Sequence, residues 1–175
     1  MQATKVWKAV TRDTVDFLDE LIEILAEQDI HYCVIGGQGV NAFATPLISL
    51  DLDLVVASEQ IEALEKALPA RFQVEKFLHS WNISVPGSDL RVQIQTDPRY
   101  FPFVERASER DVLGLRLPVA AIEDVLQGKI WAAADPERRS SKRRKDLLDI
   151  ERLLESHPRL RSSVPPEILH HLSNL

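Results

Sequence analysis

Two aspartates, Asp51 and Asp53, lie two residues apart inside the apolar run 50–56. Side chains at i and i+2 of a strand point to the same face, with their Cα atoms about 6–7 Å apart. Two carboxylates on one face of a half-buried strand repel each other and are costly to desolvate, whereas a divalent cation between them removes both costs and attracts phosphate oxygens. The pair therefore predicts a metal site for Mg²⁺ or Mn²⁺. The alternative is an edge strand with a solvated acidic face.

A glycine turn precedes the acid pair. Residues 31–35 give a short apolar strand signal, which Gly36 and Gly37 interrupt, and residues 38–44 follow as a short helix. Glycine allows close backbone approach, and the first turn of a helix offers free N–H groups to an anion. Beside the acid pair, this turn indicates a place for phosphate.

Residues 37–42 also fit the dinucleotide-binding pattern G-x-G-x-x-G/A. That fold needs a full crossover helix and an acidic residue about 20 positions further on, at the end of the second strand. Here the next strand begins near Leu50, and both acids precede the apolar residues 54–56. The spacing therefore argues against a Rossmann fold.

The glycine turn followed by Ser49 and the Asp51-x-Asp53 pair resembles the signature of the DNA polymerase β-like nucleotidyltransferase superfamily. The chain is similar in particular to small bacterial members related to type IV toxin–antitoxin (abortive-infection) nucleotidyltransferases, and to lincosamide and aminoglycoside nucleotidyltransferases. The resemblance covers about residues 14–155 and extends through Arg91-Val92-Gln93-Ile94, Pro118-Val119, Lys129 and 143–149.

The resemblance implies Mg-dependent transfer of a nucleoside monophosphate from an NTP to an RNA, protein or small-molecule acceptor. It implies that Asp51, Asp53 and Lys129 are catalytic and that the two aspartates hold the metal ion. The nucleotide-binding residues that it implies are Gly36, Gly37, Ser49, Arg91, Lys145 and Asp146.

One position departs from the superfamily pattern. A third carboxylate, on a later strand, binds a second metal ion there and serves as general base, but segment 90–94 has Gln93 in its place. Glutamine carries no charge and takes no proton near neutral pH. Asp89 and Asp97 lie four residues away, roughly 13 Å along a strand. The alternative is therefore a catalytically degraded nucleotide- or RNA-binding module, acting as a toxin–antitoxin component.

Two basic side chains have alternative interpretations. By resemblance Lys129 reaches nucleotide phosphates, but a lysine in the middle of a helix is also typical of a surface residue with a buried stem. Arg91 shares a strand face with Gln93, so it either presents a cation to phosphate or pairs with Asp53.

A basic cluster lies at positions 138–145 of a chain whose net charge is −6. The net charge excludes general nucleic-acid binding by bulk electrostatics. The cluster itself predicts a phosphate-binding patch for a nucleotide or for an RNA or tRNA acceptor, facing the same cleft as the acid pair. A solvated loop and helix start is the alternative. Its members are Arg138, Arg139, Lys142, Arg143, Arg144 and Lys145.

An α+β domain of the nucleotidyltransferase fold, with a mixed β-sheet and a helical C-terminal part, is expected to position these residues. Residues 1–157 form the predicted domain, and residues 158–175 a tail with a short helix after Pro165-Pro166. The expected helices cover 13–28, 38–44, a segment capped by Ser58, 121–134 and 141–156. The expected strands cover 31–35, 50–56, 72–78, 81–85 and 90–95, with a last hairpin over 106–111 and 115–119.

The composition, 45% hydrophobic and 27% charged over 175 residues, is that of a globular protein. No stretch approaches about 18 apolar residues, and the N-terminus lacks the apolar core of a signal peptide. The single cysteine, Cys33, falls in an apolar segment and is expected to be a buried, inert thiol. We therefore expect a cytoplasmic protein without a membrane segment, with an antitoxin as its protein partner.

Overall fold

The computed structural model describes residues 2–173, and the side chains of residues 5 and 8–173. Its centre is a mixed seven-stranded sheet in the order β3-β4-β5-β2-β1-β7-β6. Strands β2 and β5 run parallel, as do β1 and β7, and the other neighbours are antiparallel. The strands are β1 (Tyr32–Ile35), β2 (Asp51–Val56), β3 (Gln73–Lys76), β4 (Ser80–Ser84), β5 (Arg91–Gln95), β6 (Ser108–Val112) and β7 (Leu115–Val119).

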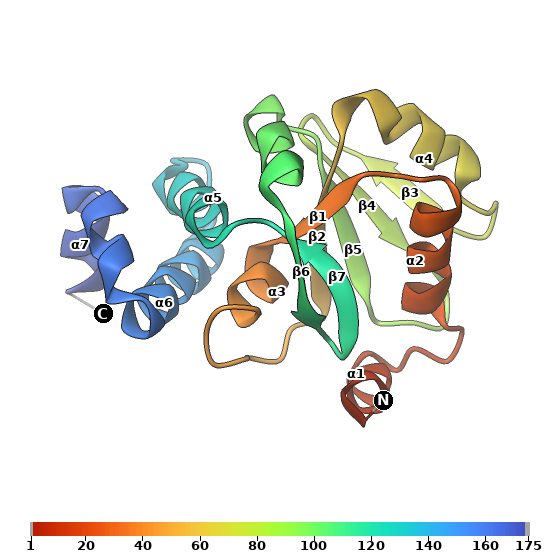
Figure 1. Cartoon of the computed structure of the whole chain (residues 1–175), viewed down its shortest axis with the longest axis horizontal. Helices are drawn as coiled ribbons and strands as arrows, with labels where there is room; N and C mark the ends of the chain where they lie inside the picture. The colour runs from red at the N-terminus through yellow and green to blue at the C-terminus, as the bar shows by residue number, and fades with distance from the viewer. Residues whose placement is uncertain (1, 174–175) are drawn as a thin grey trace.

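Helices cover both faces of this sheet (Figure 1). Helices α2 (Phe17–Glu27) and α4 (Ile61–Ala67) lie on one side, and α3 (Gly36–Asn41), α5 (Ile122–Ala134) and α6 (Ser140–Ser156) lie on the other. The chain begins with α1 (Gln2–Thr11) and ends with α7 (Pro166–Leu172). The described residues also form the 3₁₀ segments η1 (Ser58–Gln60), η2 (Pro98–Arg106) and η3 (Pro158–Ser163). The predicted α+β architecture, with a mixed sheet and a helical C-terminal part, is confirmed.

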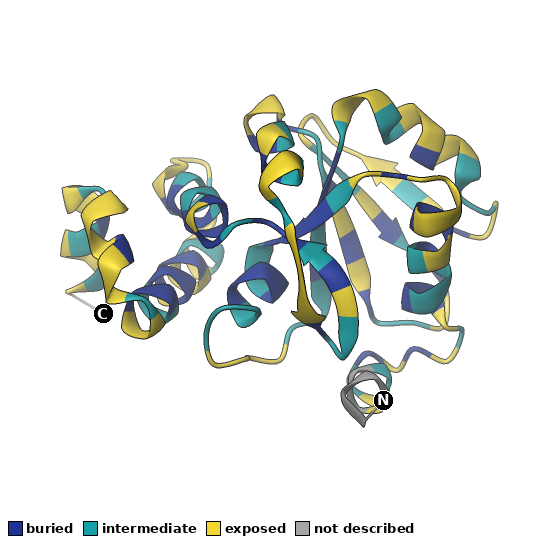
Figure 2. Ribbon diagram, in the orientation of Figure 1, coloured by how far each residue is buried: buried dark blue, intermediate teal, exposed yellow. Residues whose placement is uncertain are grey.

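Strand alternation divides the apolar residues between two cores. Leu52 and Leu54 of β2 pack with Val92 of β5 against α2, whereas Val55 belongs to the core shared with α5 and α6. Successive strand side chains point to opposite faces. Asp51 and Asp53 therefore point to the α5–α6 side. Figure 2 shows the buried residues concentrated in the central strands and on the helix faces that meet them.

The C-terminal elements pack on α5 and α6. Leu160 and Val164 near η3 and Ile168 of α7 are buried in the second core. The proposed boundary between residues 1–157 and 158–175 remains a prediction.

Some local details differ from the sequence-based expectations. Ser58 does not cap a helix with its side chain, because its hydroxyl donates to Glu59 instead. The second helix begins at Phe17 rather than Asp13, and the Asp13 carboxylate accepts hydrogen bonds from the first N–H groups of that helix. Neither α1 nor η2 was expected. Among the described residues, no helix is both long and apolar enough to cross a membrane.

Candidate active site

The acid pair lies at the start of β2, beside the glycine turn. Gly36 has φ +64°, and a Cβ at this position would lie 1.9 Å from Asp53 Oδ2. Only glycine therefore fits here, both because L side chains disfavour this backbone conformation and because the Asp53 carboxylate occupies the space. Ser49 supports the next turn, since its hydroxyl accepts a hydrogen bond from the Asp51 N–H at 3.2 Å.

Strand β5 places Arg91 and Gln93 directly beside the acids. The parallel register pairs Asp51 with Arg91 and Asp53 with Gln93. Arg91 Nε lies 2.8 Å from Asp51 Oδ1. The suggested pairing of Arg91 with Asp53 is therefore wrong by two residues, because the neighbour opposite Arg91 is Asp51.

The row that contains Gln93 continues across the sheet. Asn82 of β4 pairs with Gln93, and Glu75 of β3 pairs with Asn82. The Gln93 amide donates to Asn82 Oδ1 at 3.4 Å. This polar row was not found from the sequence, although the alternation of polar residues along the two strands was a usable signal.

The predicted residues converge on a cavity of about 490 Å³ between this open sheet face and α6. Both aspartates line it, as do Gly37, Ser49, Arg91, Gln93, Lys129, Lys145 and Asp146. Gly36 lines an adjoining hollow that shares Asp53 and Lys129 with it. The structure thus brings all the predicted residues together, while their chemical roles remain predictions.

Lys129 is held inside a network of ion pairs. Its Nζ lies 3.0 Å from Asp146 Oδ1 and 2.7 Å from Asp149 Oδ2, and its side chain is only 10% exposed. The alternative of a surface lysine is therefore wrong. Arg138 contacts the other Asp146 oxygen at 2.8 Å, and Arg152 contacts the other Asp149 oxygen at 2.8 Å. Both carboxylates of the 146–149 motif are thus shared between two cations.

The network extends to the loop that leads into β2. Arg152 also donates to Asn41 Oδ1 at 2.8 Å and to the Thr45 carbonyl. Helix α6 therefore supports both Lys129 and the segment between the glycine turn and the acid pair. Arg152 and Asn41 were not found from the sequence, because a pair 111 positions apart leaves no local pattern.

Burial and charge act in opposite directions on the two central groups. Burial raises the pKa of Asp53, and Asp51 adds to that rise, while Lys129 opposes it. For Lys129 itself burial lowers the pKa. The carboxylates of Asp149 and Asp146 outweigh burial and hold the Lys129 pKa above its usual range. Lys129 therefore remains a buried cation close to Asp53.

The basic cluster divides into two faces of α6 and the loop before it. Arg138, Lys142 and Lys145 line the cavity. Lys142 and Lys145 are three residues apart on one side of α6, and Arg138 lies in the loop before that helix. Arg143 instead donates to the Asp135 carbonyl at 2.6 Å. Arg139 and Arg144 are exposed and do not line the cavity. Half of the cluster thus faces the acid pair.

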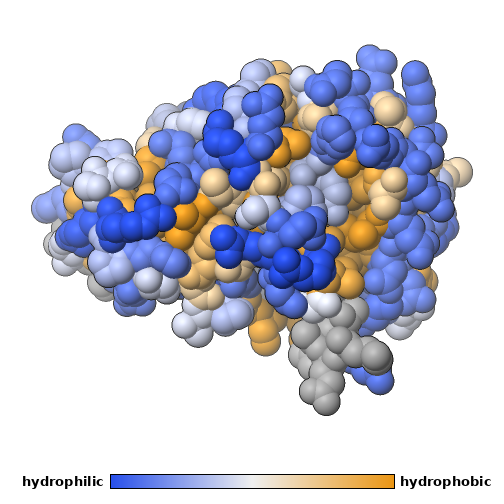
Figure 3. Space-filling model, viewed as in Figure 1, coloured by the Kyte–Doolittle hydropathy of each residue, from blue (hydrophilic) through white to orange (hydrophobic). Residues whose placement is uncertain are grey.

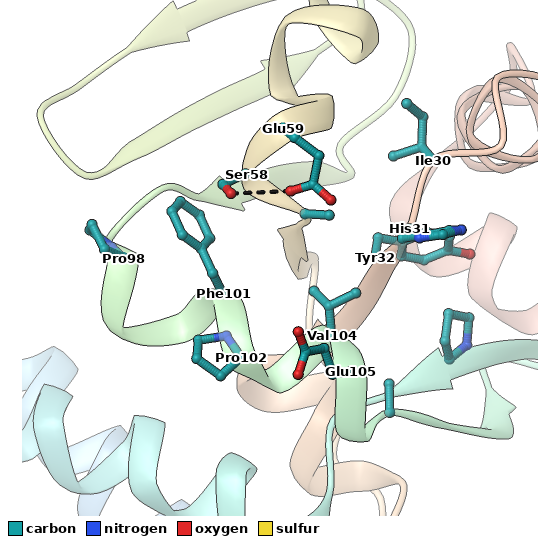
Figure 4. A pocket seen from close by; sticks show the side chains of 13 residues that line it. Ile30, His31, Tyr32, Ser58, Glu59, Pro98, Phe101, Pro102, Val104 and Glu105 are labelled. Carbon is teal, nitrogen blue, oxygen red and sulfur yellow. Dashed lines mark hydrogen bonds between the residues drawn. The ribbon is translucent and has the colours of Figure 1, made fainter.

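A second cavity, of about 640 Å³, lies elsewhere, among β1, η1 and η2 (Figure 4). Its walls carry Phe101, Pro98 and Pro102, with the carboxylates of Glu59 and Glu105, and it shares no residue with the first cavity. On the face drawn in Figure 3, hydrophilic residues predominate, with apolar patches between them. Two carboxylates without a lysine or arginine do not suit a triphosphate, so the site is assigned to the first cavity.

Asp51 and Asp53 fit a magnesium ion in chemistry and placement. Carboxylate oxygens are the ligands that Mg²⁺ prefers, usually one or two of them together with substrate phosphates. The missing Cβ of Gly36 leaves room for the Asp53 carboxylate at the turn where phosphate is expected. Within residues 2–173 no group of three or more His, Cys, Asp or Glu side chains is placed to hold a metal ion. An ion held by the two aspartates would complete its shell with phosphate or water oxygens.

Several solved structures share this fold. ANT(2″)-Ia in complex with adenylyl-2″-tobramycin matches with a TM-score of 0.60 and 13% identity, over 91% of this chain and 95% of that chain. The lincosamide antibiotic adenylyltransferase LnuA, bound to lincomycin, matches with a TM-score of 0.54 and 12% identity, over 81% of this chain and 99% of that chain. An antigenic nucleotidyltransferase-like protein from Paracoccidioides brasiliensis matches with a TM-score of 0.55 and 18% identity, over 96% of this chain and 86% of that chain. The fold is therefore that of the nucleotidyltransferases.

The sequence identifies the family more narrowly. Residues 59–170 match the family described as "Nucleotidyl transferase AbiEii toxin, Type IV TA system", and the chain belongs to that family. The matched region includes Gln93, Lys129 and Asp146 but begins after the acid pair. No curated protein sequence matches the chain.

Proposed function

We propose that this protein is a metal-dependent nucleotidyltransferase that transfers a nucleoside monophosphate from an NTP to an acceptor hydroxyl. The acceptor hydroxyl oxygen attacks the α-phosphorus and forms the new O–P bond, and its proton passes to water. The bond from that phosphorus to the bridging oxygen breaks, and pyrophosphate leaves with the bonding electrons. The observation that carries the proposal is the convergence of Asp51, Asp53 and the cationic side chains of α6 on one cavity.

The residues have distinct roles in this reaction. Asp51 and Asp53 would hold Mg²⁺, which when bound supplies Lewis-acid stabilisation of charge on the phosphates. Gly36 and Gly37 allow the triphosphate to approach the backbone. Lys129, already paired with two carboxylates, orders the site and adds positive potential beside Asp53. The remaining cations, Arg138, Lys142 and Lys145, neutralise the leaving pyrophosphate.

A second candidate function is nucleotide or RNA binding without transfer. It is favoured by Gln93, which stands in register with Asp53 where the superfamily has its third carboxylate. Without a proton acceptor there, we expect wild-type transfer to be slow rather than absent, because the acids and cations remain. The two candidates differ in whether any product forms.

Incubation with each of the four α-³²P-labelled NTPs, Mg²⁺ and either total RNA, tRNA or the protein alone tests the proposal. We expect label to enter one acceptor class, with release of pyrophosphate. Removal of metal with EDTA should abolish the signal, and Mg²⁺ or Mn²⁺ should restore it. Metal-dependent NTP binding without labelled product from any acceptor would instead support the binding module.

The divided basic cluster predicts a specific salt dependence. Replacing Lys142 and Lys145 by alanine should weaken tRNA binding and lower the slope of log affinity against log salt by about 0.7–0.9 for each lost phosphate contact. Arg139→Ala with Arg144→Ala removes the same charge from the surface outside the cavity and should change the slope less. Filter binding between low and moderate salt measures both. Equal slopes for the two double variants would mean that the cavity does not bind the RNA backbone.

The biological setting proposed is the cytoplasm, with the protein acting as the toxin of a type IV toxin–antitoxin pair. Support comes from the family described for residues 59–170. An RNA acceptor is favoured over a small molecule because three cations line one wall of the cavity. A cognate antitoxin is the proposed partner.

A further inference from the structure

Arg91 occupies an unusual position for a cation beside a metal site. Its Nε lies 2.8 Å from Asp51 Oδ1, and its side chain is 66% exposed while that of Asp51 is 25% exposed. Register fixes this contact, because Arg91 and Asp51 are direct neighbours on parallel strands. Adjacent strands are about 4.8 Å apart. Arg91 is thus held where a second cation could act on the same substrate.

Within residues 2–173, Asp51 and Asp53 are the only two carboxylates placed to hold a metal ion at the start of β2. Two-metal sites place their ions about 3.5–4 Å apart and need negative ligands that bridge them. Gln93 stands beside Asp53 and is neutral. Asp89 and Asp97 are engaged elsewhere, by Arg12 at 2.6 Å and by Arg99 at 2.7 Å.

The acidic side chains of α6 and β3 cannot serve as ligands of a second metal ion either. Asp146 and Asp149 each contact Lys129 and a second cation, so their charge is already neutralised. Glu75 lies three strands from Asp53 in the polar row, roughly 14 Å away. The site can therefore neutralise one divalent ion well but not two.

We propose that the nucleotide complex of this protein contains a single divalent ion, held by Asp51 and Asp53, and that the Arg91 guanidinium supplies the second positive charge. The inference rests on the proposed function and concerns how the same site is organised. One oxygen of Asp51 serves the ion and the other anchors Arg91. The guanidinium of Arg91, which is largely exposed to the cavity, faces the bound phosphates and can donate to two of their oxygens at once.

Counting bound Mn²⁺ by electron paramagnetic resonance tests this arrangement directly. The protein is titrated with Mn²⁺ in the presence of each of the four α,β-methylene NTP analogues, which bind but cannot transfer. We expect one Mn²⁺ per chain in the complex. Two ions per chain would overturn the inference and leave the proposed function intact, whereas no Mn²⁺-dependent binding of any analogue would overturn both.

Substitutions of Arg91 test whether its guanidinium assists nucleotidyl transfer or blocks the site. Arg91→Ala should still bind one Mn²⁺ but transfer about 10²-fold more slowly, since a preorganised donor to the phosphates is lost. Arg91→Lys should retain more of the rate than Arg91→Ala. Arg12→Ala, which breaks a similar Arg–Asp pair outside the cavity, should change neither readout. Faster transfer by Arg91→Ala would show that Arg91 merely blocks the site.

The double variant Arg91→Ala/Gln93→Asp should bind two Mn²⁺ per chain, because it restores a carboxylate and removes the competing cation. A count of one Mn²⁺ per chain would overturn the inference.

Discussion

Asp53→Asn should reduce nucleotidyl transfer by at least about a thousandfold. A metal ion contributes several kcal/mol of charge stabilisation, and each 1.36 kcal/mol is a tenfold change in rate. Asparagine is nearly isosteric but neutral, so it weakens the ion site without leaving a hole. Transfer of α-³²P label at saturating Mg²⁺ measures the effect, with Asp29→Asn as a control on a side chain that is 97% exposed.

The same variant should not lose stability. Burial raises the pKa of Asp53, so keeping this carboxylate charged costs more free energy in the folded than in the unfolded protein. A neutral amide removes that cost, and the midpoint of thermal unfolding should stay the same or rise. A fall in this midpoint together with the lost activity would indicate that Asp53 is structural. An unchanged transfer rate would remove Asp53 from the active site.

The glycine turn offers an independent check on the placement of Asp53. Gly36→Ala forces a positive-φ alanine into the space of the Asp53 carboxylate, so it should lower both the unfolding midpoint and transfer. Gly37→Ala lies in the same turn without positive φ, and its nearest neighbour is Ser49 Oγ at 3.9 Å. It should therefore leave the unfolding midpoint unchanged.

Most of the fold could be predicted because its elements have strong periodic patterns. Alternation in residues 50–56 determines both the strand and the face on which Asp51 and Asp53 lie, since Leu52 and Leu54 must be buried. Segments without such a pattern were missed. No element was predicted for residues 98–105, which contain two prolines, but the Asp97 carboxylate accepts a hydrogen bond from the Arg99 N–H at the start of a 3₁₀ segment.

The candidate site was predictable where chemistry and spacing coincide, and not where it depends on tertiary contacts. The acid pair and Lys129 have recognisable types and positions in the sequence. That Arg91 contacts Asp51 rather than Asp53 depends on the parallel register of β2 and β5. Likewise, only helix packing shows that Asp149 and Arg152 belong to the Lys129 network.

Gln93→Asp should increase transfer by at least tenfold. General-base catalysis typically contributes about 10²–10⁴-fold, and the wild-type chain has no carboxylate at this position. The new carboxylate would lie in register with Asp53, on the open sheet face that lines the cavity. It could accept the acceptor proton and, as an additional ligand, strengthen divalent-ion binding. The assay compares initial rates of label transfer for the variant and the wild type.

The pH profile distinguishes a base from a general charge effect. A carboxylate base works only when ionised, so the gain should be absent at low pH, rise as pH passes through the pKa of the new group, and then level off. Asn82→Asp adds the same charge to the same cavity one strand further from Asp53, and it should give no such gain. A fast wild-type rate that Gln93→Asp lowers would show that another residue accepts the proton, and it would exclude the degraded-module alternative. Arg91 neutralises charge but accepts no proton. We therefore expect the wild-type site to bind nucleotide well and to transfer it slowly, and we expect Gln93→Asp to raise the rate.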